Sequence, residues 1–249
     1  MAASLPSQSS SVNKTSKEEM EESKKSFQIY RERISKLPKE KGWTGEDMFL
    51  YEGCWYPSMP LVEGVMSAQE HFQARPDDII LISTPKSGTT WLKALIFAII
   101  NKICYDNSTH PLLTNNPHDC VPQLELHLFR ESPIAEVENM PSPRILATHI
   151  PYMSLPKSIL LSGCKIIYVC RDPKDVLISL WYFVSKKRTS KEPPLSLEEA
   201  YKLFSKGICS FGPVWDHVQR YWKASQECPD KFFFVMYEEM KRDTINFSL

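Results

Sequence analysis

The sequence of 249 residues has no excess of charge of either sign, because 30 Lys and Arg residues balance 30 Asp and Glu residues. A broad basic surface for nucleic acid is therefore excluded, and any anion site has to be a local cluster. Long apolar runs are also missing, since the longest, residues 94–100, is far too short to span a bilayer. The N-terminus lacks the apolar core of a secretory signal. We expect a cytoplasmic protein that binds neither nucleic acid nor membrane.

Cysteine and histidine occur without the spacings that define a framework. The seven Cys residues are odd in number and contain no Cys-x-x-Cys pair, and the six His residues show no ligand spacing. Such a pattern is typical of reduced thiols rather than of disulfides or a zinc site. We expect no bound metal.

What is present is a chain able to bury a sizeable core, with 42% hydrophobic residues. We expect residues 1–16, which are Ser-rich and polar, to be a disordered tail and residues 17–249 to form a single domain. Residues 16–37 indicate a solvated helix, residues 49–56 an aromatic strand or hairpin, residues 67–72 a short helix and residues 105–121 a loop.

Short apolar stretches at residues 79–82, 145–149, 165–171 and 232–237 alternate with helical patterns. This alternation predicts an α/β fold in which helices cover a central parallel sheet, with ligands bound at the carboxyl ends of the strands. Asp172 followed by Pro173 predicts the start of one helix, and Ser196 with Glu199 predicts a capping box at another.

The first of these strands leads into a polar loop and then a helix. Between them stand Lys86, Ser87, Gly88, Thr89 and Thr90. A strand–loop–helix of this kind directs backbone N–H groups and the positive end of the helix dipole at one point, which suits an anion. The alternative is a polar turn that binds nothing.

Two further polar features follow the next strands. His149 ends the second strand, where it can accept a proton from a hydroxyl or simply be satisfied by a backbone carbonyl. Arg171 ends the third strand and Ser179 lies in the helix that follows it. A guanidinium and a hydroxyl placed in this way suit a second phosphate, although Arg171 could instead pair with Asp172 or Asp175.

The segment from Pro85 to Trp91, Pro-Lys-Ser-Gly-Thr-Thr-Trp, resembles the 5′-phosphosulfate-binding loop of the cytosolic sulfotransferases. These enzymes use 3′-phosphoadenosine 5′-phosphosulfate (PAPS). The loop is not a Walker A loop, because the spacing Gly-x-x-x-x-Gly-Lys-[Ser/Thr] is absent. The segment from Ala147 to Pro151, Ala-Thr-His-Ile-Pro, is similar to that of the plant branch of the family. The resemblance covers residues 41–242 and implies the P-loop-like, three-layer sulfotransferase fold.

This resemblance implies a role for each candidate residue. Lys86 and the loop residues Ser87, Gly88, Thr89 and Thr90 would hold the 5′-phosphosulfate, and His149 would abstract the proton of the acceptor hydroxyl. Lys86 would also neutralise charge on the bridging oxygen as the bond breaks. Arg171 and Ser179 would bind the 3′-phosphate, and Trp91 and Tyr237 would contact adenine. The acceptor would be a small hydroxyl compound of flavonoid, hydroxyjasmonate or steroid type, and the transfer would need no metal.

The sequence departs from the family pattern at its end. The family continues to an Arg-Lys-Gly segment and Gly-x-x-Gly-x-Trp, and residues 243–249 contain neither. We therefore expect a domain that is incomplete at its C-terminus. Two alternatives to an active sulfotransferase stay open: an inactive family member acting only as a nucleotide-binding or interaction protein, and a nucleotide kinase or NTPase, which a requirement for Mg²⁺ would reveal. The oligomeric state is not predicted.

Overall fold

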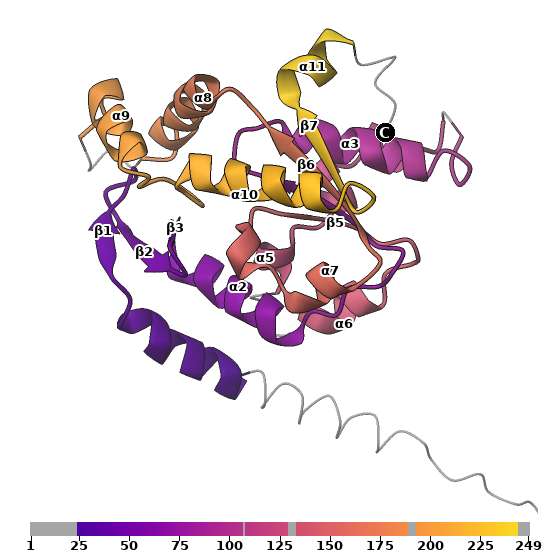
Figure 1. Cartoon of the computed structure of the whole chain (residues 1–249), viewed down its shortest axis with the longest axis horizontal. Coiled ribbons are helices and arrows are strands. Elements are labelled where there is room, and N and C mark those ends of the chain that lie inside the picture. Colours follow the sequence, from indigo (N-terminus) through magenta and orange to yellow (C-terminus); the bar gives the residue numbers. More distant parts are fainter. Residues whose placement is uncertain (1–23, 107, 129–132, 189–192, 244–249) are drawn as a thin grey trace, which may run out of the picture.

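The computed structural model describes residues 24–106, 108–128, 133–188 and 193–243, so the tail expected at residues 1–16 lies outside the described residues. At its centre is a four-stranded sheet with the order β5-β4-β6-β7 (Figure 1). All of its pairings are parallel. The strands are β4 (Ile79–Ser83), β5 (Ile145–Thr148), β6 (Lys165–Cys170) and β7 (Phe232–Met236). The predicted α/β fold with a central parallel sheet is confirmed.

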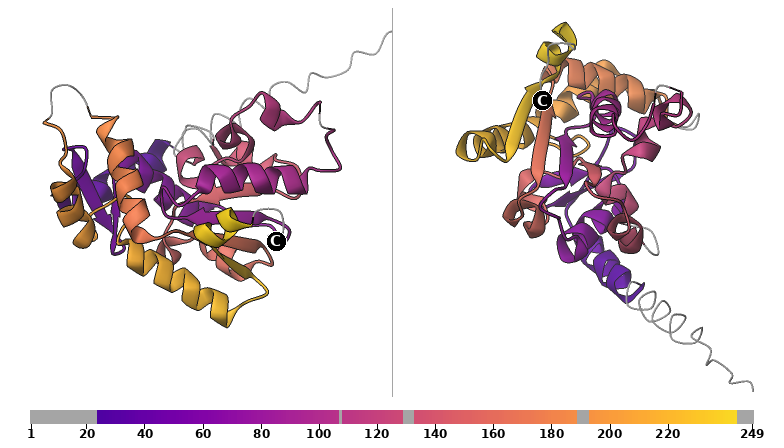
Figure 2. Two further views of the ribbon diagram at one scale, coloured as in Figure 1. Left: turned by 90° about the horizontal axis from the view of Figure 1, so that it is seen from above. Right: turned by 90° about the vertical axis from the view of Figure 1, so that its right-hand side faces the viewer.

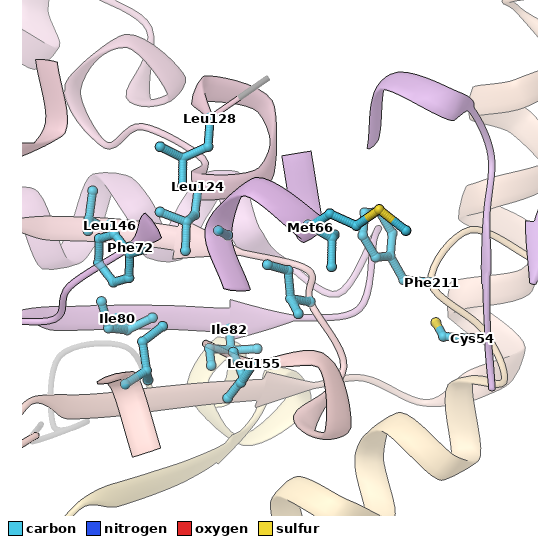
Figure 3. Packing of buried hydrophobic residues seen from close by; sticks show 14 of the residues in the cluster. Cys54, Met66, Phe72, Ile80, Ile82, Leu124, Leu128, Leu146, Leu155 and Phe211 are labelled. Carbon is cyan, nitrogen blue, oxygen red and sulfur yellow. The ribbon is translucent and has the colours of Figure 1, made fainter. Parts of the chain in front are cut away.

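Both faces of this sheet are buried, as expected for parallel strands. Successive side chains point to opposite faces, so Ile80 and Ile82 of β4 join one apolar cluster while Leu81 joins another. The first cluster is packed by α2 (Met59–His71), α7 (Lys157–Leu161) and α10 (Val214–Glu227), and the second by α3 (Thr89–Ile100) and α11 (Tyr237–Arg242). Figure 2 shows α3 and α10 on opposite sides of the sheet. Figure 3 shows the first cluster, where Ile80 and Ile82 meet Leu155 and Leu146. The result is three layers.

A smaller antiparallel sheet precedes the parallel one. It has the order β1-β2-β3 and consists of β1 (Lys39–Lys41), β2 (Asp47–Tyr51) and β3 (Cys54–Tyr56), which confirms the expected aromatic hairpin. The helix before it spans residues 24–35 within the described part of the chain. The prediction that this helix is solvated is wrong on one face, because Tyr30 and Ile34 are buried against the main core.

Other boundaries also differ from the predictions. The helix expected at residues 67–72 is the longer α2, because Pro60 stands in its first turn and permits an earlier start. The loop expected at residues 105–121 contains η1 (Pro111–Leu113) and α4 (Pro117–Cys120). The side chains of Asn116 and His110 cap these turns. Because the segment is rich in polar residues, which are typical of a loop, the short helical turns were not predicted.

The helix starts read from capping residues are confirmed. The Asp172 side chain accepts from the Lys174 N–H at the start of α8 (Pro173–Ser185). Ser196 and Glu199 form the capping box of α9 (Leu197–Ser205). The remaining short elements are α5 (Leu124–His127), α6 (Pro133–Glu138) and η2 (Tyr152–Ser154). No helix in the described ranges combines the length and the apolar character needed to cross a membrane.

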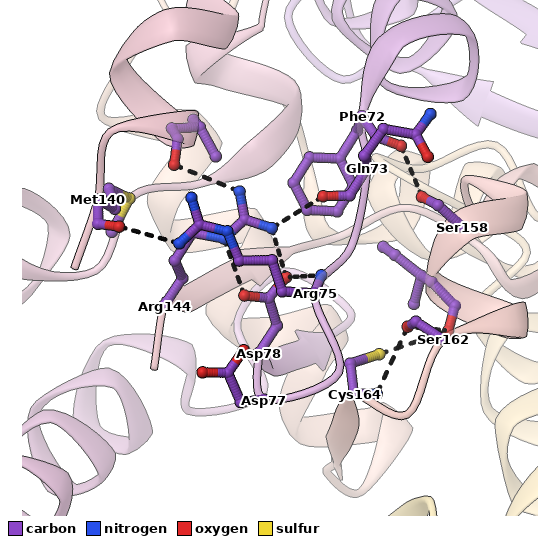
Figure 4. Close-up of polar contacts among 12 residues, drawn as sticks. Phe72, Gln73, Arg75, Asp77, Asp78, Met140, Arg144, Ser158, Ser162 and Cys164 are labelled. Carbon is purple, nitrogen blue, oxygen red and sulfur yellow. Dashed lines mark hydrogen bonds and ion pairs between the residues drawn. The ribbon is translucent and has the colours of Figure 1, made fainter. Parts of the chain in front are cut away.

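A buried ion pair fixes the start of the parallel sheet. The Arg144 guanidinium donates to Asp78 through Nε at 2.8 Å and Nη2 at 2.6 Å, and both side chains are at most 1% exposed. Its remaining donors reach the carbonyls of Val137 and Gln73, while Asp78 also accepts from the Arg75 N–H (Figure 4). Arg144 directly precedes β5 and Asp78 directly precedes β4, so this ion pair sets the register of the two strands.

We predict that Arg144→Met lowers the free energy of unfolding by about 3–5 kcal/mol, because it leaves the Asp78 carboxylate buried without its partner. Urea unfolding followed by circular dichroism measures this loss. The double variant Arg144→Met, Asp78→Asn should recover part of it, since no buried charge remains. Lys202→Met, which breaks an exposed pair with Glu198, is the control and should change nothing measurable. A loss of less than 1 kcal/mol in Arg144→Met would contradict the prediction.

Candidate functional site

The carboxyl ends of three adjacent strands bring the predicted polar residues to one edge of the sheet. Strand β4 lies between β5 and β6, and the segments that follow these strands carry Lys86, His149 and Arg171 respectively. Direct hydrogen bonds connect the three segments. His149 Nδ1 lies 2.6 Å from the Ser83 carbonyl, and Arg171 Nη1 donates to the Lys86 carbonyl at 3.2 Å. The structure thus brings together residues that lie more than 80 positions apart in the sequence.

The loop after β4 has the backbone of an anion site. Lys86 and Gly88 both have positive φ, at 70° and 99°. The first intrahelical bond of α3 runs from the Leu92 N–H to the Gly88 carbonyl at 3.0 Å, and no side chain caps the helix. The N–H groups of the residues before Leu92 therefore have no acceptor within the helix. Uncapped N–H groups at the positive end of a twelve-residue helix favour an anion.

The hydroxyl groups of this loop are not equivalent. Ser87 Oγ lies 2.7 Å from Thr84 Oγ1, and Thr89 Oγ1 lies 2.6 Å from Ser83 Oγ. All four residues are buried, and the two hydroxyl pairs stabilise the conformation of the loop. Thr90 is exposed. Of the three hydroxyl-bearing loop residues that the resemblance assigned to the 5′-phosphosulfate, Thr90 is the one that is exposed.

The Lys86 ammonium is half-buried and surrounded by other cations. Its Nζ lies 4.4 Å from the centroid of the Phe183 ring, whose residue belongs to α8. Burial lowers the pKa of Lys86, and the nearby charges of Arg171, Lys187 and Lys186 lower it further. A group in this position gains most from a nearby negative charge, because such a charge offsets the repulsion.

Arg171 occupies a more crowded place than its sequence suggested. Its Nη2 forms an ion pair with Asp175 at 3.1 Å, and its guanidinium lies over the Tyr237 ring at 4.8 Å. The pairing that we considered as an alternative is therefore present. Ser179 lies one turn beyond Asp175 in α8 and is half-buried, and within the described part of the chain no hydrogen bond joins it to Arg171.

Tyr237 packs against the loop and against Trp91. The Tyr237 and Trp91 rings meet edge to face with centroids 6.0 Å apart. A Cβ atom at Gly88 would lie 2.6 Å from Tyr237 Cδ2, so any larger residue at position 88 would collide with this ring. The two aromatic residues that the family resemblance assigned to adenine thus lie side by side, next to the loop.

His149 is held in one tautomer. A carbonyl oxygen only accepts, so the hydrogen bond from Nδ1 to the Ser83 carbonyl requires the proton on Nδ1. Nε2 then carries the lone pair, and it pairs with no other residue in the described ranges. Burial lowers the pKa of His149, so the ring is neutral at pH 7. Its geometry and charge state are those of a proton acceptor.

Glu125 supports this histidine, and sequence reasoning did not identify it. Its carboxylate is fully buried and accepts from the His149 N–H at 2.9 Å, from Thr148 Oγ1 at 2.7 Å and from Gln123 Nε2 at 2.6 Å. Its charge partly offsets the effect of burial on the pKa of His149. Glu125 is the one carboxylate in the mainly apolar segment at residues 121–128, and this position was the feature of the sequence that could have indicated its role.

An aromatic wall adjoins His149 on the side of the antiparallel sheet. The Phe211 ring lies 5.4 Å from the His149 ring and 5.3 Å from the ring of Tyr56 in β3. Backbone hydrogen bonds between Trp55 and residues 211–212 fix this arrangement. The aromatic hairpin is mostly buried, and its Tyr56 connects to the site through Phe211.

Fold and site together define a class: an α/β protein with a P-loop-like strand–loop–helix and a histidine at the end of the neighbouring strand. The sulfotransferase domain family matches residues 76–246. Cytosolic sulfotransferase 12 of Arabidopsis thaliana is 45% identical over 214 residues, which are 85% of this chain and 65% of that protein. For cytosolic sulfotransferase 17 of the same plant the identity is 45% over 225 residues, which are 90% and 64% of the two chains. The chain belongs to the sulfotransferase family, in the group of the plant cytosolic sulfotransferases, and it spans slightly less than two thirds of these relatives.

Solved structures agree with this assignment. A candidate steroid sulphotransferase from Arabidopsis thaliana superposes with a TM-score of 0.76 at 45% identity, covering 85% of this chain and 72% of that one. Mouse sulfotransferase SULT7A1, solved with 3′-phosphoadenosine 5′-phosphate (PAP), gives a TM-score of 0.60 at 29% identity, covering 79% and 64%. The sulfotransferase fold implied by the loop motif is confirmed.

The buried histidines of the site predict acid sensitivity. Burial lowers the pKa of His217 from its ordinary value of 6.5 to about 4, and it also lowers that of His149. Between these values the unfolded chain binds a proton that the folded chain does not, so stability falls as pH decreases from about 6.5 to about 4. His217 alone should account for a loss of about 3 kcal/mol over this range.

Urea unfolding at pH 7.5, 6.5, 5.5 and 4.5 measures this slope. His217 bonds to Tyr168 OH through Nδ1 at 2.9 Å and to the His149 carbonyl through Nε2 at 3.0 Å. The variant His217→Gln cannot titrate, so it should be less stable at pH 7.5 and lose less on acidification. An identical pH slope in both proteins would rule out His217 as the source.

Proposed function

We propose that this chain transfers a sulfuryl group from PAPS to a hydroxyl of a small organic acceptor. The observation that carries the proposal is the link through Ser83. Its carbonyl accepts from His149 Nδ1, and its hydroxyl lies 2.6 Å from Thr89 Oγ1 of the anion loop. A proton acceptor and an anion site are thereby joined at a single residue at the end of β4.

In this proposal the loop holds the 5′-phosphosulfate. Backbone N–H groups around Gly88 and the outward hydroxyl of Thr90 donate to its oxygens, while Ser87 and Thr89 keep the loop in shape. His149 Nε2 takes the proton from the acceptor hydroxyl as its oxygen forms a bond to sulfur. The bond between sulfur and the bridging oxygen breaks, and Lys86 neutralises the negative charge that develops on that oxygen.

The 3′-phosphate is assigned to Arg171, with Ser179 further along α8. Arg171 would exchange its exposed pairing with Asp175 for the phosphate, a substitution of one charge-assisted contact for another. Adenine is assigned to Trp91 and Tyr237, whose edge-to-face contact forms an aromatic site beside the loop.

The acceptor is assigned to the side of the aromatic wall, beyond His149. Phe211 is buried in contact with His149 and Tyr56, which favours a flat or alicyclic hydroxyl compound of flavonoid, hydroxyjasmonate or steroid type. The Arabidopsis structural relative described as a candidate steroid sulphotransferase is consistent with such an acceptor. Like the relatives named cytosolic, the chain would act in the cytosol, without a metal and without nucleic acid or membrane partners.

The binding half of the proposal is tested by calorimetric titration of the 249-residue chain with PAP and with 5′-AMP, in the presence of EDTA. We expect PAP to bind more tightly, because only PAP has the 3′-phosphate that Arg171 would hold. Arg171→Met should weaken PAP about 10- to 100-fold, the loss expected for one charge-assisted contact, and should change 5′-AMP much less. Lys174→Met, which removes an exposed cation three residues away, is the matched control and should change neither. Equal affinity of the wild-type chain for both nucleotides would reject the 3′-phosphate site.

The catalytic half is tested with labelled PAPS and a panel of flavonol, hydroxyjasmonate and hydroxysteroid acceptors. His149→Gln should lower turnover about 10²- to 10⁴-fold, because its amide can still donate to the Ser83 carbonyl but cannot take a proton. PAP affinity should stay unchanged in this variant. Nucleotide binding without turnover by the wild-type chain would favour the alternative of a nucleotide-binding protein that is not an enzyme. Turnover of ATP that requires Mg²⁺ would favour the kinase alternative.

A further inference from the structure

Below the anion loop, helix α3 carries a buried lysine that the proposed chemistry does not use. Lys93 has no exposed surface, and its Nζ donates to the Val121 carbonyl at 2.8 Å and lies 3.1 Å from His118 Nδ1. Burial lowers the pKa of Lys93 to about 8, while the charge of Glu125 raises it, so the ammonium form still predominates at pH 7. A buried lysine is costly, and a plain structural role would be filled as well by an apolar residue of similar length.

The polarity of these contacts follows from the chemistry of the groups. An ammonium group only donates, so His118 Nδ1 accepts the hydrogen bond from Lys93. Partial burial lowers the pKa of His118, and the charge of Lys93 lowers it further. A neutral ring with an acceptor at Nδ1 carries its proton on Nε2. His118 Nε2 lies 3.0 Å from Thr90 Oγ1, so it donates to that hydroxyl.

The hydrogen bonds from Lys93 to His118 and from His118 to Thr90 therefore end at the Thr90 hydroxyl and fix its orientation. Thr90 Oγ1 already accepts from His118, and its own proton is free to point elsewhere. Thr90 and His118 are exposed whereas Lys93 is buried, so the chain runs from the core outward to the N-terminus of α3. Thr90 is the loop hydroxyl that is not occupied by another loop residue, in contrast to Ser87 and Thr89.

We propose that Lys93 and His118 are positioning residues that fix Thr90 as a hydrogen-bond donor to the 5′ anion of the nucleotide. The inference rests on the proposed function and deepens it, since Lys93 and His118 would act on the nucleotide through Thr90 without contacting it themselves. Other charged and titratable groups act on this series of hydrogen bonds. Glu125 and His149 interact with Lys93, and Asp119 interacts with His118.

The first test needs no ligand. The ¹⁵N chemical shifts of the histidine rings report which nitrogen carries the proton, and the His118 signals are assigned by their loss in His118→Gln. In the wild-type chain at pH 7 we expect the neutral form with the proton on Nε2. In Lys93→Met the acceptor contact at Nδ1 is lost, so a mixture of tautomers is expected. A proton on Nδ1 in the wild-type chain would overturn the inference.

The second test separates a positioning role from a general effect on folding. PAP and adenosine 3′-phosphate differ in the 5′-phosphate alone, so the ratio of their affinities reports the contribution of the loop. We expect His118→Phe and Lys93→Met to weaken PAP about tenfold and to leave adenosine 3′-phosphate nearly unchanged. His118→Gln should restore most of the loss, because an amide offers an acceptor to Lys93 and a donor to Thr90. Lys102→Met, which removes an exposed cation just beyond α3, is the control and should leave the ratio unchanged.

A double-mutant cycle completes the test. If His118 acts through Thr90, His118→Phe should have little further effect on PAP in a Thr90→Val background. Equal weakening of both nucleotides, or independent losses in the cycle, would overturn the inference while leaving the proposed function intact. A wild-type chain that binds neither nucleotide would overturn the proposed function, and this inference with it.

Discussion

The arrangement of the site depends on the hydrogen bond between His149 Nδ1 and the Ser83 carbonyl. It joins the ends of β4 and β5, fixes the tautomer of the histidine and leaves Nε2 as the free acceptor. The Ser83 hydroxyl in turn contacts Thr89, the first residue of α3, so the anion loop is built on the same residue. Since a strand end has no freedom to move once its neighbours are paired, the distance between His149 and the loop is set by the register of the sheet.

Buried charge around this bond is balanced by specific partners. Glu125 receives three hydrogen bonds, from Gln123, Thr148 and the His149 backbone, and these satisfy its carboxylate in a fully buried position. Lys93, on the other side, is close enough for its charge to lower the pKa of His149 while that of Glu125 raises it. Burial has the largest effect on the pKa of His149 and lowers it, so the ring is neutral at pH 7.

Much of this could be predicted from the sequence, and the reasons for the failures are specific. Strand positions, helix caps and the loop at Lys86 follow from local patterns, because periodicity and capping are properties of neighbouring residues. The adjacency of Lys86, His149 and Arg171 followed from the rule that parallel strands end at one edge. Glu125, Lys93 and His118 were missed because their meaning depends on contacts between segments that are far apart in sequence. The pairing of Arg171 with Asp175 was foreseen only as an alternative, since one sequence cannot rank two partners for the same guanidinium.

Although the net charge of the chain is zero, positively charged side chains are clustered around the loop at Lys86. Lys86, Arg171, Lys186 and Lys187 lie close enough for the last three to lower the pKa of the first. Aromatic faces partly compensate this repulsion: the Phe183 ring contacts both Lys86 and Lys187, and the Tyr237 ring contacts Arg171. Such contacts stabilise cations without neutralising them, and Arg171 is in addition paired with the carboxylate of Asp175. A site framed in this way keeps its attraction for a multiply charged anion although the protein as a whole is neutral, which is why composition excluded a nucleic-acid surface but not a nucleotide site.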